Sequence, residues 1–163
     1  MEGDTGTRRY KWFRPRQAAR GGVPTTTASS AHFATIGLFN SSTGPTVLVV
    51  RDWSAWLPSS TIVVLTGYNQ GRLSGTNYPA SRLFPGDPSP AGLLDYSNQA
   101  GKLAGDYTLE ASLNWIMWTH DFPFAVVPPG WTLFFQHQSA ANPLAVSLLW
   151  EEVSIDELEY FYY

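Results

Sequence analysis

Short runs of apolar residues, separated by turn residues, follow one another along the chain from about residue 32 to residue 152. They cover residues 32–39, 46–53, 61–68, 107–118, 122–127, 131–138 and 144–152, and each is rich in Val, Ile, Thr, Leu or aromatic side chains. Helical periodicity is almost absent, and runs of this length and composition are typical of β-strands. Seven such strands predict an all-β chain, folded as an antiparallel β-sandwich of the jelly-roll type.

The segments around these runs divide the chain into three parts. Residues 1–30 have no strand or helix period and contain Gly21, Gly22 and Pro24, so they are predicted to form an extended arm. Residues 31–153 form the β-sandwich body. Within it, residues 69–106 carry scattered glycines and prolines and are predicted to be a long loop region.

Two local features refine this division. Residues Leu93 to Tyr96 are a candidate strand within the long loop region. Residues 154–163 form an acidic aromatic tail, where Ser154 can cap a short helix with Glu157 at the capping-box position.

Charge is distributed unevenly along the chain, whose formal net charge is -3. Residues 1–22 carry six basic and two acidic groups, a net +4, which leaves -7 on the remainder. Residues 151–163 hold five acidic residues and no basic one. These opposite charges predict a head-to-tail electrostatic contact between subunits.

The basic arm also contains Tyr10, and the residues predicted to contact a neighbouring subunit are Arg8, Arg9, Lys11, Trp12, Phe13, Arg14, Arg16 and Arg20. Interleaved basic and aromatic side chains also fit nucleic acid, because they can pair with phosphates and stack on bases. This pattern alone does not distinguish a neighbouring subunit from nucleic acid as the partner.

Composition excludes several classes of protein. The chain has no Cys, so a disulfide framework, a thiolate metal site and a Cys nucleophile are excluded. No apolar run reaches the roughly 18–20 residues that cross a bilayer, and the N-terminus lacks the apolar stretch of a signal peptide. We therefore expect a soluble protein made in the cytoplasm. Aromatic residues make up 15% of the chain and charged residues 14%, which indicates surfaces that meet partners.

Enzyme motifs are absent from the sequence. No phosphate-binding P-loop occurs, and the segment from Gly71 to Gly75 has its Ser one place too late for a nucleophile elbow. The three histidines, His32, His120 and His137, are not at metal-ligand spacing. We expect no catalytic residue, no metal and no cofactor.

The carboxylates and tryptophans raise two alternatives to an assembly function, a hydrolase and a carbohydrate-binding protein. Glu151 and Glu152 are adjacent in a strand, so they point to opposite faces and cannot converge on one substrate. A hydrolase would need Glu110 close to another carboxylate, and we expect these glutamates to be solvated at an edge instead. The tryptophans fit either a core or subunit interface or a carbohydrate platform; they include Trp53, Trp56, Trp115, Trp118, Trp131 and Trp150. Asn40-Ser41-Ser42 has the form of a glycosylation sequon, but we expect a turn there.

The most specific pattern lies in residues 121–152. An apolar strand leads to Pro128-Pro129-Gly130, a second strand begins at Trp131, a turn contains Asn142-Pro143, and the last strand closes with Trp150-Glu151-Glu152. This pattern resembles the C-terminal hairpin of small β-sandwich proteins encoded among bacteriophage virion genes. Residues 29–53 similarly resemble their opening strands. The residues that carry the hairpin pattern are Pro128, Pro129, Gly130, Asn142, Trp150 and Glu152.

The resemblance implies assembly into a virion rather than catalysis. The expected function is that of a phage structural protein, either a capsid decoration or minor capsid protein or a tail component, located in the virion. Its expected partners are itself, as a closed ring or trimer, and other virion proteins, with no membrane. The tail residues expected to contact neighbours are Glu157, Glu159, Phe161, Tyr162 and Tyr163. The alternative is a receptor- or carbohydrate-binding module of a virion.

Overall fold

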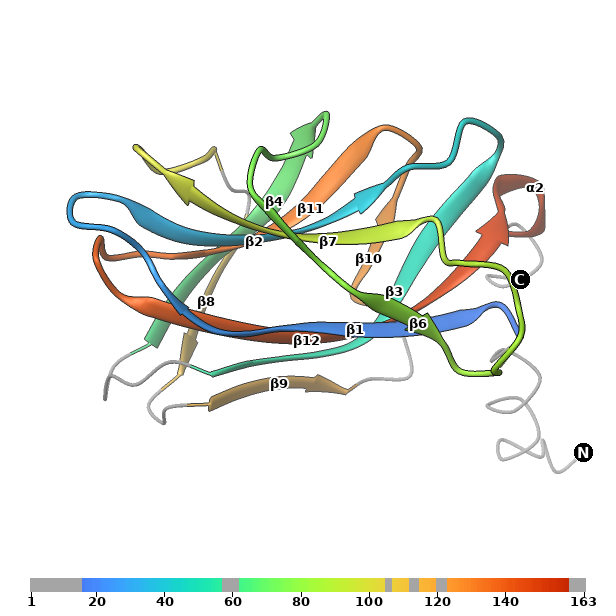
Figure 1. Ribbon diagram of the computed structural model, residues 1–163, viewed down its shortest axis with the longest axis horizontal. Helices are drawn as coiled ribbons and strands as arrows, with labels where there is room; N and C mark the ends of the chain where they lie inside the picture. Colours follow the sequence, from blue (N-terminus) through green and yellow to red (C-terminus); the bar gives the residue numbers. More distant parts are fainter. Residues whose placement is uncertain (1–15, 57–61, 105–106, 112–114, 120–122, 159–163) are drawn as a thin grey trace, which may run out of the picture.

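The fold is a sandwich of two antiparallel β-sheets (Figure 1). The computed structural model describes residues 16–56, 62–104, 107–111, 115–119 and 123–158, with the backbone alone at 62–63, 107–111 and 115–119. This confirms the predicted all-β class and the sandwich architecture.

The described strands divide equally between the two sheets. Sheet A has the order β10 (Ala125–Val127), β3 (Thr46–Trp56), β12 (Pro143–Ser154), β1 (Ala18–Thr27) and β6 (Ala80–Arg82), and β9 (Trp115–Thr119) also pairs with β3. Sheet B has the order β5 (Thr76–Tyr78), β7 (Gly92–Gln99), β2 (Phe33–Asn40), β11 (Trp131–His137), β4 (Ile62–Gln70) and β8 (Tyr107–Ala111). The described helix is α2 (Ile155–Leu158).

The connectivity is that of a jelly roll. When β5, β6 and β7 are set aside and β9 and β10 are counted as one interrupted strand, eight consecutive strands remain. Successive strands lie in opposite sheets except the fourth and fifth, which are neighbours in sheet B; the order is 6-3-8-1 in sheet A and 2-7-4-5 in sheet B. Two interlocked Greek keys of this kind define the jelly roll.

The core lies between the sheets and is built by the two-residue alternation of the strands. On β12 the inward side chains of Leu144, Val146, Leu148 and Trp150 are all at most 3% exposed. Trp53 of β3 fills the centre, with its ring 5.0 Å from that of Phe135 on β11. Burial of each large apolar side chain stabilises the fold by about 1.5–3 kcal/mol.

A β-bulge in β3 changes which residues face the core. Val50 is opposite Trp150 and Asp52 is opposite Leu149, so Arg51 is an extra residue without a counterpart on β12. Val50 is therefore buried before the bulge and Trp53 after it. The bulge thereby shifts the inward and outward alternation of β3 by one residue.

The predicted boundary of the N-terminal arm is wrong. Residues 18–27 form β1, which lies inside sheet A between β12 and β6. The glycines interpreted as linker sit where elements approach closely, since a Cβ on Gly21 would lie 2.5 Å from Cδ1 of Leu94. Residues 1–15 of the predicted arm lie outside the described residues.

The prediction of a long loop region at residues 69–106 is wrong in part, because three strands, β5, β6 and β7, lie within it. The expected strand at Leu93 to Tyr96 is confirmed as part of β7. The segment 76–82 pairs first with β7 of sheet B and then with β1 of sheet A, changing sheets at Pro79. It thereby closes the sandwich along one side.

Two further predictions, for residues 107–118 and for the segment after Ser154, have opposite outcomes. The single strand expected at 107–118 is two strands, β8 in sheet B and β9 in sheet A. The helix expected after Ser154 is present as α2, which is one turn long. Among the described residues, no helix has the length and apolar character needed to cross a membrane.

Candidate assembly site

The chain enters β1 and leaves β12 at the same end of sheet A. The two strands are antiparallel neighbours, with Ala18 opposite Glu151. One residue earlier, the carbonyl of Gln17 accepts a hydrogen bond from the backbone N–H of Glu152 at 2.9 Å. Gln17, just before β1, and the helix α2 after β12 therefore lie at the same end of sheet A (Figure 1).

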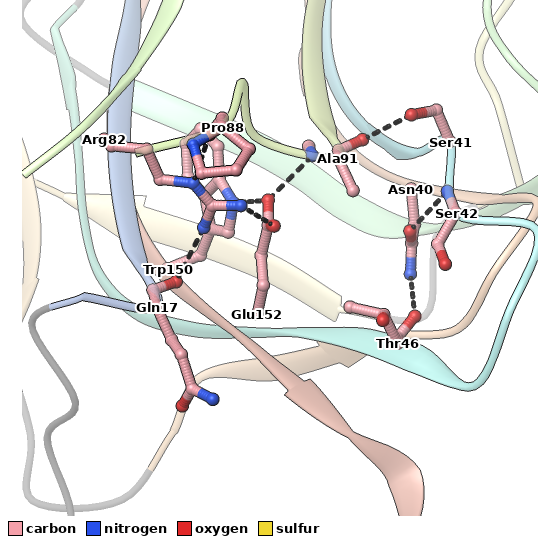
Figure 2. Close-up of polar contacts among 11 residues, drawn as sticks. Gln17, Asn40, Ser41, Ser42, Thr46, Arg82, Pro88, Ala91, Trp150 and Glu152 are labelled. Atoms are coloured by element: carbon pink, nitrogen blue, oxygen red, sulfur yellow. Dashed lines mark hydrogen bonds and ion pairs between the residues drawn. The ribbon is translucent and has the colours of Figure 1, made fainter. Parts of the chain in front are cut away.

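Arg82 of β6 fixes this end of the sheet (Figure 2). Its guanidinium forms an ion pair with the Glu152 carboxylate, Nη2 to Oε2, at 2.6 Å. It also donates to the carbonyls of Gln17 at 3.1 Å and Pro88 at 2.9 Å. One side chain thus joins the start of β1, the end of β12 and the loop between β6 and β7.

The other carboxylate oxygen of Glu152 is also occupied. Oε1 accepts from the backbone N–H of Gly92 at 3.1 Å and from Nε1 of Trp150 at 3.3 Å. A Cβ on Gly92 would lie 2.7 Å from the Trp150 ring, so only glycine fits there. Trp150 and Glu152 face the same side, as residues two apart in a strand must, and together they tie β12 to β7.

Asn40 organises the turn next to this cluster (Figure 2). Its side-chain nitrogen donates to the carbonyls of Thr46 and Val127, both at 2.9 Å. Its Oδ1 accepts from the N–H of Ser42 at 3.0 Å. The residue is fully buried, which agrees with the interpretation of this sequon as a turn.

The turn at residues 41–45 makes hydrogen bonds both to the segment before β7 and to α2. The Ser41 hydroxyl donates to the carbonyl of Ala91 at 2.7 Å. The N–H of Ile155 in α2 donates to the carbonyl of Pro45 at 2.9 Å. The position of α2 is therefore fixed relative to the turn, and through it to the start of β7.

Glu151 lies on the opposite side of β12 from Glu152. Its fully buried carboxylate pairs with Nε of Arg51, the bulge residue, at 2.5 Å. The two glutamates face away from each other as expected, each towards its own arginine. The expectation that they lie at a solvated edge is wrong, because both are buried. Near them, Val47, Val49 and Val153 form a second apolar cluster with Val126 and Leu158 packed against it.

A third buried carboxylate has the same kind of partner on sheet B. Asp95 accepts from Nε and Nη2 of Arg72, both at 2.6 Å, and from the Asn77 side chain at 3.3 Å. The hydrogen bond to Asp95 raises the pKa of Arg72 above its ordinary value. Arginine's planar fork suits this bidentate pairing.

Exposed groups gather beside the paired ends of β1 and β12. The Arg16 guanidinium lies 5.6 Å from the centre of the Phe84 ring, and Phe84 is 41% exposed. Ile155 at the start of α2 is 52% exposed, and the acidic residues of the helix follow it. We define the terminal face as Arg16, Phe84, Ile155, Asp156 and Glu157.

The predicted subunit-contact residues are only partly placed. Arg16 and Glu157 lie on the terminal face, and Arg20 is an exposed residue of β1. The remaining ones lie outside the described residues; they are Arg8, Arg9, Lys11, Trp12, Phe13, Arg14, Glu159, Phe161, Tyr162 and Tyr163.

Four of the predicted hairpin residues lie in the connections before β11 and β12, namely Pro128, Pro129, Gly130 and Asn142, and the other two, Trp150 and Glu152, lie in β12. Trp131 N–H donates to the carbonyl of Pro128 at 3.2 Å, and Gly130 has a φ of 76°, as a type II turn with Pro129 at its second position requires. The side chain of Asn142 donates to the carbonyl of Ala140 at 2.8 Å, just before β12 begins.

Sequence reasoning missed Arg82, Gln17 and Gly92. Two of them lie in the segment interpreted as a loop and the other in the segment interpreted as an arm. No local pattern marks a residue as the partner of a glutamate 70 positions away, so only the fold brings these groups together.

Comparison of the chain with protein-family models, with curated proteins and with solved structures found no match. In the described part of the chain, no three His, Cys, Asp or Glu side chains are grouped so that they could hold a metal ion.

Proposed function

We propose that this chain is a structural subunit that assembles with other subunits through its terminal segments, as a component of a bacteriophage virion. The observation that carries the proposal is that Arg82 joins the start of β1, at Gln17, to the end of β12, at Glu152, at one end of sheet A. The virion assignment is supported by the resemblance of residues 121–152 to small virion β-sandwich proteins, with positions as capsid decoration, minor capsid or tail component.

The use of buried charge supports a structural role. Glu151, Glu152 and Asp95 are each paired with an arginine, so these carboxylates hold strands and loops in place. A buried ion pair contributes little net stability compared with apolar packing, but it costs much to break. Such pairs specify one geometry, which is what a surface that must fit a neighbour needs.

The test of this proposal is self-association of the purified chain. We expect the full chain to form a homo-oligomer, measured by light scattering after size-exclusion chromatography. Charge screening by added salt should weaken the assembly, because the terminal segments carry opposite charges. A chain that remains monomeric at low and high salt would refute the proposal.

A second candidate function is glycan binding, and one observation favours it. Trp131 of β11 and Tyr68 of β4 are each 37% exposed, and Tyr68 is opposite the buried Leu133. The exposed Gln70 is opposite Trp131, and flat rings beside an amide can stack on and hydrogen-bond a sugar. Tyr78 is less suitable, since it packs against the core.

Glycan-array binding by the chain, lost on Trp131→Ala, would establish this second function. The matched control is Trp56→Ala, which removes another exposed tryptophan, at the end of β3. Binding that both variants retain, or no binding by the unmodified chain, would exclude a sugar platform at Trp131.

A further inference from the structure

The turn after β1 and the loop before β12 lie side by side, at the end of the body opposite α2 (Figure 1). The N–H of Ala141 donates to the carbonyl of His32 at 2.9 Å, and the N–H of His32 donates to the carbonyl of Ser29 at 3.0 Å. These backbone hydrogen bonds join the loop of residues 138–142, between β11 and β12, to the turn of residues 29–32.

Both of these segments hold an alanine in a strained backbone conformation. Ala31 has a φ of 65° and Ala141 a φ of 58°, in the left-handed region that alanine rarely adopts. Ala31 precedes His32 in the chain and Ala141 donates to the His32 carbonyl, so the two strained residues meet at one place. Strain of this kind persists only where surrounding contacts hold it. The contacts of the loop therefore determine whether it keeps this conformation.

His137, the last residue of β11, makes one of these contacts with its side chain. Its Nδ1 accepts a hydrogen bond from the N–H of Ser139 at 2.9 Å, so the neutral ring carries its proton at Nε2. The residue is 4% exposed, and Nε2 has no hydrogen-bond partner among the described residues. A second proton can bind only at Nδ1, where it removes the acceptor of the Ser139 N–H. The protonated ring is then a buried charge.

The described side chains of the strands that pack against β11 offer no charge to balance a protonated His137. These strands are β2, β4, β10 and β12. β2 and β10 contain no titratable residue, and β4 contains Tyr68 alone. The acidic residues of β12 are Glu151 and Glu152, which lie towards its other end and are paired with arginines. The neighbouring turn contributes His32, which is itself a base.

We propose that uptake of a proton by His137 opens the loop of residues 138–142. The neutral ring holds the loop by accepting from Ser139, whereas the protonated ring cannot accept and is hydrated when the loop opens. Burial lowers the pKa of the ring below its ordinary value of 6.5. The loop is therefore held fully above about pH 6.5 and is released as the pH falls towards the lower value. Relaxation of Ala31 and Ala141 favours the same change.

This property goes beyond the proposed assembly function and does not depend on it. The test is amide hydrogen exchange of the full chain, measured by NMR at pH 8 and pH 5 and corrected for the intrinsic rate at each pH. We expect the protection of the Ser139 and Ala141 amides to fall by up to about 30-fold, because pH 5 is about 1.5 units below 6.5.

Val146, in the middle of β12 between β1 and β3, is the internal control. Its amide should be more protected than that of Ala141 at both pH values, because opening of the loop is local. Equal protection of the two amides at each pH would overturn the proposal, since the loop would then open only when the whole body unfolds.

Two variants identify the group that binds the proton. In His137→Gln the protection of the Ala141 amide should no longer depend on pH, whereas His32→Gln, the matched control, should behave as the unmodified chain does. The imidazole nitrogen shifts of the unmodified chain give a test that needs no variant, because protonation at Nδ1 and loss of protection should share one midpoint. A pH dependence that persists in His137→Gln, or a ring that becomes protonated while the loop stays closed, would overturn the proposal.

Discussion

Glu152 is the residue on which the geometry of the terminal face most depends. Its side chain is 6% exposed and its two oxygens take three partners, of which Arg82 carries the balancing charge. The same arginine also holds the carbonyl of Gln17. A change at Arg82 therefore acts on the fold and on the position of the N-terminal segment together.

Arg82→Met should lower the free energy of unfolding by about 3–5 kcal/mol, because it leaves a buried carboxylate without its counter-charge. Urea denaturation measures the loss. The matched control, Arg20→Met, removes an exposed arginine of β1 and should change stability by about 0.5 kcal/mol or less.

The double variant Arg82→Met, Glu152→Met separates charge from packing. It should recover part of the loss, because it removes the unpaired charge as well. Equal losses in the single and the double variant would mean that the hydrogen bonds of Arg82 to backbone carbonyls, rather than the ion pair, stabilise this end.

His137 is the residue that should make stability depend on pH. It is 4% exposed, its Nδ1 accepts from the N–H of Ser139 at 2.9 Å, and its Nε2 has no hydrogen-bond partner among the described residues. Burial lowers the pKa of His137 below its ordinary value of 6.5. The folded state therefore favours the neutral ring.

Because the unfolded chain binds the proton more readily, the contribution of His137 is complete above about pH 6.5 and is lost as the pH falls towards the lower folded pKa. Urea denaturation between pH 8 and pH 5 should show this decline, and His137→Gln should remove most of it. His32→Gln is the control, and its free energy of unfolding should decline with pH as that of the unmodified chain does. An unchanged decline in His137→Gln would contradict the role given to His137.

At the scale of elements, the sequence predicts what local pattern determines. The strands from β2 to β4 and from β10 to β12 follow runs of apolar residues, and the turn at Pro128–Trp131 follows from proline and glycine chemistry. Opposite facing of Glu151 and Glu152 follows from strand alternation. These features need no knowledge of distant contacts.

The errors at this scale come from elements that only the tertiary structure explains. β5 and β6 are three residues each, too short to show a period. β1 contains two glycines and a proline, which weaken a strand in isolation. Gly21 is present because Leu94 and Ala80 leave no room for a side chain, and that reason appears only when the sheets are packed.

The turn between β10 and β11 offers a clean test of backbone conformation. Gly130 has a φ of 76° and open space around its Cβ position, so Gly130→Ala strains the backbone without a clash. We expect a loss of about 1–2 kcal/mol by urea denaturation. Gly44→Ala, an exposed glycine without positive φ, should be neutral or slightly stabilising. Equal effects would contradict the turn assignment.

At the scale of the whole molecule, the boundary between body and arm determines which truncation is informative. Removal of residues 1–15 leaves β1 and the Gln17 contacts intact. Removal of residues 1–22 takes half of β1, including Ala19, which lies opposite Trp150. Thermal melting should show the first variant as stable as the full chain and the second unfolded or strongly destabilised.

The closed body is consistent with a role that resides at its ends. The segment 76–82, which contains β5 and β6, closes one side of the sandwich. The ion pairs of Glu151 and Glu152 with arginines hold β12 in place. The terminal face lies at the end of this body, and the sequence beyond it contains further charged and aromatic residues.

The most direct test of assembly through the terminal segments is the native mass of the full chain compared with that of the chain lacking residues 1–15, at equal concentration and low salt. The account predicts an oligomer for the full chain and a folded monomer for the truncated one. An oligomer of unchanged mass in the truncated chain, or a monomer in both, would contradict it.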